Sequence, residues 1–324
     1  MEKVNDIVLG LDIGGTTSTF GFVDQEGNLL AEDKILTLAD EPVTRFLPRL
    51  FVGIRALFDG LKAGYNLKGI GIGAPNANYH TGNIENPPNL RWGPVTNICE
   101  LLKNEFKVPI VLTNDANAAA IGEMRFGSAR GMKDFIMITM GTGLGSGIVV
   151  NGKLVYGHDG FAGELGHTLV NVNGRFCGCG RRGCLETYVS ATGIRRTVYK
   201  LLADYTDPSP LRKVAFDDLS AEMISEHALR GDKIAMLAFE YTGRILGMKL
   251  ADAVVHTSPE AIFLFGGLAN AKDLIYQPAY QNMEAHMTPI FKGKVKLAIS
   301  GLQGKNAAVL GTAALIWDEL EQKT

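Results

Sequence analysis

The 324-residue sequence has few cysteines, two tryptophans and no excess of charge of either sign. Lys and Arg together number 32 against 34 Asp and Glu, which gives a net charge of −2 with neutral histidines. No run of basic residues offsets this balance, so the sequence predicts no nucleic-acid partner. No apolar stretch approaches the ~20 residues that span a bilayer, so we expect no membrane partner either.

The first residues, MEKVNDIVLGLDIGG, do not follow the pattern of a secretory leader. They lack a basic region followed by an apolar stretch and a small-residue cleavage site, and we therefore expect a cytoplasmic protein. Three of the four cysteines, Cys177, Cys179 and Cys184, lie within eight positions. In a reducing compartment such crowding indicates metal binding before disulfides. Cys99 stands alone on a predicted helix and is interpreted as a core residue.

Glycine is abundant, with 39 residues, and the glycines are clustered. The background frequency is about 7%, which would give roughly 23 in a chain of this length. Hydrophobic residues make up 46% of the sequence, enough for a sizeable core. The length predicts two domains of about 160 residues each.

One pattern of strands and turns occurs twice along the chain. Strands predicted at 7–13, 16–23 and from 29 surround the turn Gly14-Gly15, and strands at 135–139, 148–150 and 153–156 surround a glycine-rich turn over 141–147. Further strands are predicted at 68–73, 109–113, 261–265 and 295–299. Helices are predicted at 43–60, 97–106, 116–126, 220–256 and 305–320. Thr96 is the expected N-cap of the second helix and Ser220 that of the fourth. Strands and helices alternate, which indicates an α/β protein with one copy of the repeated unit per domain and a cleft between the copies.

The first glycine-rich turn has the sequence Asp12-Ile13-Gly14-Gly15-Thr16-Thr17. Small residues let backbone amides approach a phosphate, and an Asp at a strand end can hold water on a magnesium ion. A hairpin without function would look similar, and the same alternative holds for the second turn, 141–147. Neither a dinucleotide-binding fingerprint nor a P-loop motif is present. Two such turns on a duplicated scaffold favour phosphate binding.

Asn114-Asp115 stands where a predicted strand meets a helix. Asp115 would there be either a helix N-cap or, because reacting groups collect at strand ends in α/β proteins, a general base. The residues alone leave both interpretations open.

The most specific stretch joins Gly163-Glu164-Leu165-Gly166-His167 to the run CGCGRRGCLE at 177–186. Three thiolates and one imidazole, from Cys177, Cys179, Cys184 and His167, suit a closed tetrahedral zinc site. Gly and Arg surround these cysteines, which argues against buried apolar thiols. Glu164 and Glu186 flank the group, as solvated carboxylates or as acceptors for sugar hydroxyls.

Taken in order, the motifs Asp-x-Gly-Gly-Thr, Asn-Asp, Gly-Thr-Gly-x-Gly, Gly-Glu-x-Gly-His and C-x-C-G-x-x-G-C-x-E make the chain resemble the ROK family of bacterial sugar kinases and sugar-responsive repressors. The resemblance covers essentially the whole chain. It implies two actin-like (ribonuclease H-like) lobes with ATP and a hexose in the cleft between them. The lobes would be 1–118 with about 305–324, and 119–304 with a zinc-binding loop at about 163–186.

The resemblance also implies roles for individual residues, with Asp115 as the base that deprotonates the sugar hydroxyl. The hexose would be bound by Gly73, Asn89, Asn114, Asp115, Glu164, His167 and Glu186. The nucleotide, with Mg²⁺, would be bound by Asp12, Gly14, Gly15, Thr16, Thr17, Gly141, Thr142, Gly143, Gly266 and Gly267. A structural Zn²⁺ would be held by His167, Cys177, Cys179 and Cys184.

The function expected from the resemblance is ATP-dependent phosphorylation of a hexose at its primary C6 hydroxyl, with glucose as the substrate, by a homodimer or homotetramer. Kinases for N-acetylglucosamine, N-acetylmannosamine, mannose or fructose share these motifs, and Asn76 follows Pro75 where the family often has Pro-Gly, which leaves the sugar open. Sugar-sensing repressors of the family carry a helix-turn-helix domain before the first motif, whereas eleven residues that read as a strand precede Asp12 here. A catalytically silent actin-like scaffold is a further alternative.

Overall fold

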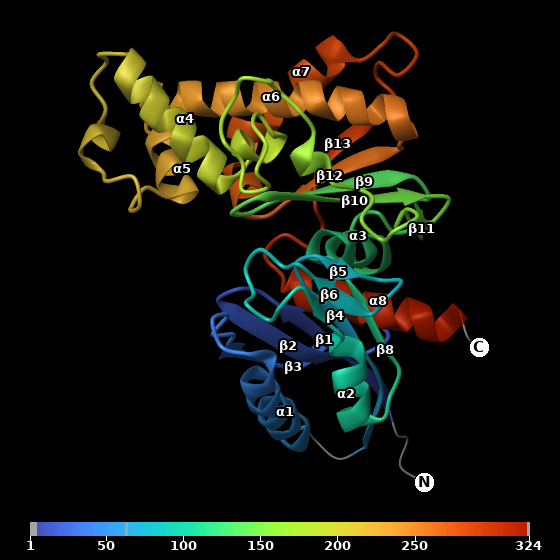
Figure 1. The fold of residues 1–324 in the computed structure, drawn as a ribbon. Helices are drawn as coiled ribbons and strands as arrows, with labels where there is room; N and C mark the ends of the chain where they lie inside the picture. Colours follow the sequence, from blue (N-terminus) through green and yellow to red (C-terminus); the bar gives the residue numbers. More distant parts are fainter. Residues whose placement is uncertain (1–4, 62–63, 323–324) are drawn as a thin grey trace. The chain divides into compact units, whose positions relative to one another are not determined.

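The computed structural model describes residues 5–61 and 64–322, which form two compact units (Figure 1). Unit 1 runs to Gly131 and adds Leu154–Ala162 and the segment from Gly304 onward; unit 2 comprises Met132–Lys153 and Gly163–Gln303. The boundary predicted after residue 118 falls inside helix α3 (Asp115–Phe126). This helix packs against α8 (Ala307–Gln322), so both helices belong to unit 1.

Unit 1 is built on a five-stranded sheet in the order β3-β2-β1-β4-β8. The strands are β1 (Asn5–Ile13), β2 (Thr17–Val23), β3 (Leu29–Leu36), β4 (Tyr65–Gly73) and β8 (Ile110–Thr113). The β3-β2-β1 part is antiparallel, and β1, β4 and β8 run parallel. The ends of the parallel strands therefore meet at one edge.

Helices cover both faces of this sheet. α8 lies against the face that carries Gly10 and Gly71, where an added Cβ on Gly71 would lie 1.8 Å from the Thr312 carbonyl oxygen. Side chains alternate along a strand, so Leu9 and Leu11 point to the other face. There they share a core with residues of α1 (Val43–Asp59) and α2 (Ile98–Phe106). A small sheet of β5 (Ala77–Asn78), β6 (Asn83–Glu85) and β7 (Val95–Thr96) completes the unit.

Unit 2 repeats the same sheet, in the order β11-β10-β9-β12-β13. The strands are β9 (Phe135–Met140), β10 (Leu144–Val150), β11 (Lys153–Leu154), β12 (Ala261–Phe265) and β13 (Lys296–Ile299). The helices are α4 (Ala191–Asp204), α5 (Ala221–Leu229), α6 (Lys233–Thr257) and α7 (Asp273–His286), with short 3₁₀ turns η1 (Leu165–His167), η2 (Leu185–Thr187), η3 (Pro210–Lys213) and η4 (Gly267–Ala271). The predicted duplication and the α/β class are confirmed.

Several predicted boundaries are wrong for local reasons. The helix expected over 220–256 is two helices, because the chain turns at Gly231 with a φ of 86°; Ser220 does cap the first of them, accepting the N–H of Met223. Asn97 caps α2 in place of Thr96, whose hydroxyl donates to the Trp92 carbonyl. The glycine-rich turn of 141–147 is shorter than expected, since β10 already begins at Leu144, and the strand of 153–156 ends at Leu154.

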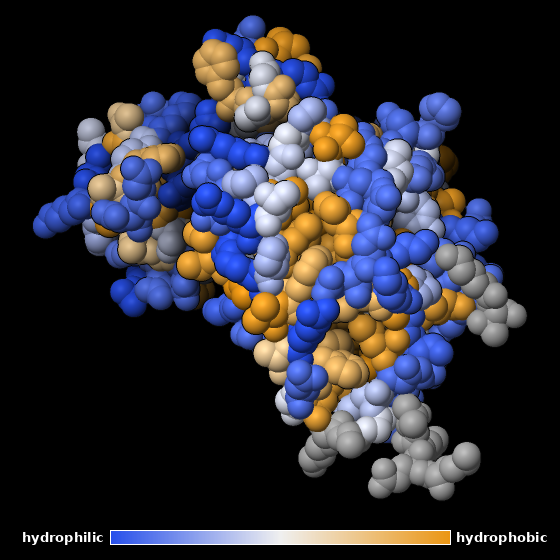
Figure 2. Space-filling view, turned by 60° about the horizontal axis from the view of Figure 1, so that its bottom comes forward, coloured by the Kyte–Doolittle hydropathy of each residue, from blue (hydrophilic) through white to orange (hydrophobic). Residues whose placement is uncertain are grey.

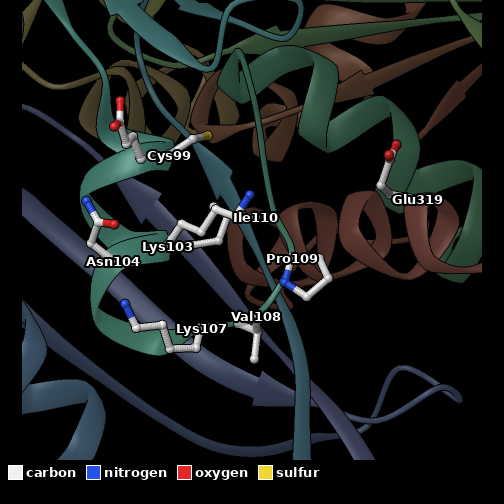
Figure 3. A pocket seen from close by; sticks show the side chains of 9 residues that line it. Cys99, Lys103, Asn104, Lys107, Val108, Pro109, Ile110 and Glu319 are labelled. Atoms are coloured by element: carbon white, nitrogen blue, oxygen red, sulfur yellow. The ribbon is translucent and has the colours of Figure 1, made fainter.

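Two surface hollows of unit 1 lie outside the predicted site. A groove between α1 and α2 is lined by Phe22, Ile54, Phe58, Leu67 and Phe106, among others, and Figure 2 shows apolar side chains gathered at the end of this unit that it brings forward. A second hollow of about 920 Å³ lies beside α2 and is lined by Cys99, Glu100, Lys103, Asn104, Lys107, Val108, Pro109, Ile110 and Glu319 (Figure 3). None of these residues is a predicted site residue. Among the described helices, none is both long and apolar enough to cross a membrane.

Candidate active site

The parallel strands of unit 1 bring several predicted site residues to one edge of its sheet. Asp12 on β1 lies beside Gly73 on β4, and Gly73 lies beside Thr113, the last residue of β8. An added Cβ on Gly73 would be 3.4 Å from Asp12 Oδ1. Asn114 and Asp115 follow Thr113 directly, so the sheet register alone gathers these residues.

Asn114, and not Asp115, is the N-cap of α3. Asn114 Oδ1 accepts the N–H of Ala116 at 2.8 Å, and Asp115 is the first residue of the helix. Asp115 Oδ1 also accepts from Ala116, at 2.8 Å, while its side chain keeps access to solvent. The interpretation of Asp115 as the cap is therefore wrong, and an accessible carboxylate stands at the edge where a base is expected.

Both carboxyl groups at this edge hold protons more tightly than usual. Burial, and then the negative charge of Asp115, raise the pKa of Asp12 to about 7. The protein packed around Asp115 raises its pKa too, because it limits hydration of the charged form, although the N–H groups of Ala116 and Asp115 work in the opposite direction. A nearby cation would offset the burial and the negative charge of Asp115 that disfavour the ionised form of Asp12, so the Asp12 carboxylate suits a hydrated Mg²⁺ ion.

The turn between β1 and β2 is held rigidly. The Gly14 N–H donates to the Thr17 carbonyl at 3.1 Å, and the hydroxyl of Thr37 donates to the Gly14 carbonyl at 2.7 Å. Asn89 lies against this turn, since an added Cβ on Gly15 would be 3.0 Å from Asn89 Cβ. The predicted hexose residue Asn89 and the predicted phosphate turn are thus neighbours. The sequence did not predict that Thr37 would stabilise this turn, because no motif surrounds it.

In unit 2 the two predicted phosphate segments lie at one end of the second sheet. The first is the turn from Gly141 to Gly143, closed by a Gly141 N–H bond to the Gly143 carbonyl at 3.1 Å. The second begins at Gly266, whose φ is 99° and whose added Cβ would be 2.7 Å from the carbonyl oxygen of Met140. The side-chain amide of Gln303 forms two hydrogen bonds with the backbone of Gly266: its Nε2 donates to the Gly266 carbonyl at 3.2 Å, and its Oε1 accepts the Gly266 N–H at 3.3 Å. The sequence did not indicate a role for Gln303.

The four predicted zinc ligands come together. The ligand atoms of His167, Cys177, Cys179 and Cys184 all lie within 4.8 Å of one another, and none of the cysteines forms a disulfide. Cys177 Sγ is 3.7 Å from His167 Nδ1, and Cys179 Sγ is 3.6 Å from Cys184 Sγ. Burial tends to raise the pKa of Cys179, but the backbone and side-chain N–H groups of Arg181 lower it to about 6. Burial raises the pKa of Cys177.

Glu186 connects this cluster to the glycine turn. Its Oε1 accepts from the Cys177 thiol at 3.0 Å, and its Oε2 accepts from the Leu144 N–H at 3.4 Å. Glu164, the other predicted carboxylate, is exposed at the start of η1, three residues before His167. Unit 2 therefore contains the four predicted zinc ligands, both predicted hexose carboxylates and the glycine turn of 141–143.

The sequence profile of the ROK family matches residues 8–319. The chain belongs to the ROK family. It is 32% identical to the glucokinase of Thermotoga maritima over 317 residues, covering 97% of this chain and 98% of that protein. It is 33% identical to the glucokinase of Halalkalibacterium halodurans over 316 residues, covering 95% and 94% of the two chains. The resemblance drawn from the motifs is confirmed.

Solved structures give the same result. A ROK glucokinase from Streptomyces griseus, in complex with glucose and AMPPNP, superposes with a TM-score of 0.81 at 30% identity, covering 95% of this ROK chain and 98% of that one. A ROK transcriptional regulator superposes with a TM-score of 0.87 at 28% identity and is covered over 80% of its length. The actin-like fold class is thereby confirmed.

Proposed function

We propose that this ROK protein is an ATP-dependent hexose kinase that phosphorylates the C6 hydroxyl of glucose. The observation that carries the proposal is Asp115, an accessible carboxylate of raised pKa beside Asp12 and Gly73 at the edge where β1, β4 and β8 end. The near-complete coverage of glucokinases at 32–33% identity supports the choice of reaction and of sugar.

In this proposal Asp115 accepts the proton of the C6 hydroxyl while the hydroxyl oxygen attacks the γ-phosphorus, and ADP leaves with the electron pair of the broken bond. Phosphoryl transfer depends mainly on positioning and on neutralising charge. Because the N–H groups of Gly14, Gly141 and Gly266 are engaged within the protein, the remaining backbone N–H groups of the turns 14–17 and 141–143, and that of Gly267, hold the phosphates. Mg²⁺, when bound through water to Asp12, supplies further neutralisation of phosphate charge.

Hexose recognition is proposed for both units. Gly73, Asn89 and Asn114 act from unit 1, and Glu164, His167 and Glu186 act from unit 2. The side-chain oxygen of Asn114 is engaged in the helix cap, so its amide NH₂ is the group that meets a sugar oxygen.

The Cys₃His group fits a structural zinc ion. Its four ligand atoms are close enough to share one metal, and four such ligands fill a tetrahedral site with no position left for water or substrate. We propose that His167, Cys177, Cys179 and Cys184 hold Zn²⁺ and thereby fix the loop that carries Glu164 and Glu186.

The proposal is tested by ADP release from ATP in the presence of a panel of about ten hexoses and amino-hexoses, with Mg²⁺ present. Glucose should give the highest kcat/KM, and Asp115→Asn should lower kcat at least ~10²-fold while leaving hexose affinity nearly unchanged. Turnover of N-acetylmannosamine or mannose but not glucose would support the proposed reaction and show that the proposed sugar is wrong. Absence of turnover with every sugar would refute the proposal.

A sugar-responsive repressor is the second candidate, because the ROK regulator superposes at least as well as the glucokinase and a xylose repressor of Caldicellulosiruptor bescii is 26% identical over 317 residues. That repressor is covered over only 78% of its length, against 98% for the Thermotoga glucokinase. A DNA-binding titration at low salt discriminates the two: sugar-sensitive binding to DNA without ADP release would favour the repressor.

A further inference from the structure

The segment that follows the last cysteine of the cluster touches the glycine turn at two points. We call residues 184–193 the junction. Glu186 Oε2 accepts from the Leu144 N–H at 3.4 Å, and the Ala191 N–H donates to the Gly141 carbonyl at 2.8 Å. Between these two contacts, an added Cβ on Gly143 would be 2.7 Å from Glu186 Oε2. The junction therefore borders both ends of the turn.

The junction is itself internally fixed through Ser190, which is buried. The Ser190 hydroxyl donates to the Glu186 carbonyl at 2.7 Å and accepts the N–H of Gly193 at 2.9 Å. One side chain thus ties η2, which carries Glu186, to the first turn of α4, which carries the Ala191 N–H. A shift of either part would be transmitted to the other.

Arg175 attaches the junction to the metal-ligand loop. It stands two residues before Cys177 and donates to the carbonyls of Thr187 and Gly193 at 2.8 and 2.9 Å. Its guanidinium also stacks on the ring of Tyr188 at 4.5 Å. Cys184 is both a member of the cluster and the first residue of the junction. The metal-ligand loop is therefore joined to the junction by the chain itself at Cys184 and by the contacts of Arg175 farther along.

We propose that the junction positions the turn at 141–144 for the nucleotide, so that the metal cluster controls nucleotide affinity as well as hexose affinity. The inference rests on the proposed function, in which this turn binds phosphate. Donor groups contribute to phosphate binding only when they are preorganised, and the two junction contacts fix the backbone that carries them.

The first experiment measures AMPPNP binding by calorimetry, with Mg²⁺ and without any sugar. Ser190→Ala removes the tie between η2 and α4 and alters no residue assigned to ATP, hexose or zinc. We expect its AMPPNP affinity to fall about tenfold, the smaller of the losses typical when a residue that orients a metal ligand is removed, and its zinc content to stay unchanged. Ser220→Ala is the matched control, because it removes an N-cap serine from α5 in the same unit. It loses the same kind of capping bond and should keep its AMPPNP affinity.

The second experiment applies the same titration to Glu186 and to the metal. Glu186→Ala should weaken AMPPNP binding in the absence of sugar, and Glu186→Gln should restore most of it, since an amide oxygen can still accept from Leu144. Chelation of zinc should weaken AMPPNP binding as well. A residue that only contacts the hexose would change none of these values.

The outcomes separate this inference from the proposed kinase activity. If Ser190→Ala, Glu186→Ala and zinc-free protein all bind AMPPNP like the wild type, the inference is refuted even where the kinase assay succeeds. If no hexose supports ADP release but these changes weaken AMPPNP binding, the inference stands and the kinase proposal fails. Wild-type protein that does not bind AMPPNP refutes both.

Discussion

At the scale of single residues, Asp115 is the side chain that the proposed reaction needs as its base. Asp115→Asn keeps the shape and the Ala116 hydrogen bond but cannot accept a proton. We expect kcat to fall at least the ~10²-fold typical of a general base, with little change in hexose affinity. Because the pKa of Asp115 is raised, wild-type kcat should decline on acidification at a higher pH than an ordinary carboxylate would give. Steady-state kinetics across pH test this, and near-normal kcat in the variant would leave Asp115 without a catalytic role.

Ionised Asp12 should lower the free energy of unfolding of the unliganded protein at neutral and alkaline pH. Its pKa is raised from 3.8 to about 7 in the folded chain, so its contribution to the free energy of unfolding is fully favourable below pH ~4 and is lost as the pH rises through about 7. Asp12→Asn should therefore be more stable than wild type at pH 8, by on the order of 2 kcal/mol at about 1.4 kcal/mol per pKa unit with a discount for its solvent access. The difference should vanish near pH 4. Urea unfolding at both pH values measures it, with the exposed Asp59→Asn as the control; a stability difference that does not depend on pH would contradict it.

At the scale of elements, the sequence predicted the two five-stranded sheets better than the helices, and it did not predict the small sheet β5-β6-β7. Apolar runs bounded by glycine define a buried strand by themselves, which is why β1, β4, β9 and β12 were predicted. The helices α4 and α7 were missed, since α7 contains Pro278 and α4 starts directly after the irregular cysteine-rich stretch. Tertiary packing, which the local pattern does not contain, stabilises both.

In the candidate site, too, some neighbours could be predicted from the sequence and others could not. Residues at the ends of neighbouring parallel strands could be placed together, because sheet topology puts those ends at one edge. The Glu186 contact with Leu144 could not be predicted, because the two residues are 42 positions apart and the chain between β11 and η2 is largely irregular. The two hydrogen bonds between Gln303 and Gly266 join residues 37 positions apart and likewise have no local signal.

The β9-β10 turn gives a prediction at this scale. The resemblance assigns Gly143 to the nucleotide, but an added Cβ there would meet Glu186 Oε2, the movable end of a side chain assigned to the hexose. Gly143→Ala should therefore fold normally, displace Glu186 and raise the KM for both hexose and ATP. Gly141→Ala is the comparison, because its added Cβ has no atom within 4 Å and should affect ATP alone. Equal hexose KM values in the two variants would show that Glu186 is not displaced.

At the scale of the whole molecule, the two sheets have separate apolar cores. One cluster of buried residues includes Leu9, Phe20 and Phe46, and the other includes Ile138, Phe239 and Leu264, so each unit is stabilised largely by its own interior. The metal-ligand set belongs to unit 2, where Leu185 and Tyr188 beside it join the second core. Loss of the metal should therefore destabilise one unit and not the other.

Zinc removal, by chelation or by Cys179→Ser, tests this separation through amide hydrogen exchange. We expect one zinc per wild-type chain and faster exchange in β9, β10 and β12 once the metal is gone, because metal binding energy is folding energy for the loop it closes. Exchange in β1, β4 and β8 should stay unchanged, as these strands pack in the core of unit 1. In calorimetry, unit 2 should accordingly unfold at a lower temperature in the zinc-free protein than in the zinc-loaded protein. Added Zn²⁺ should reverse the effect in the chelated protein but not in Cys179→Ser, and acceleration spread evenly over both sheets would mean that the two cores do not unfold independently.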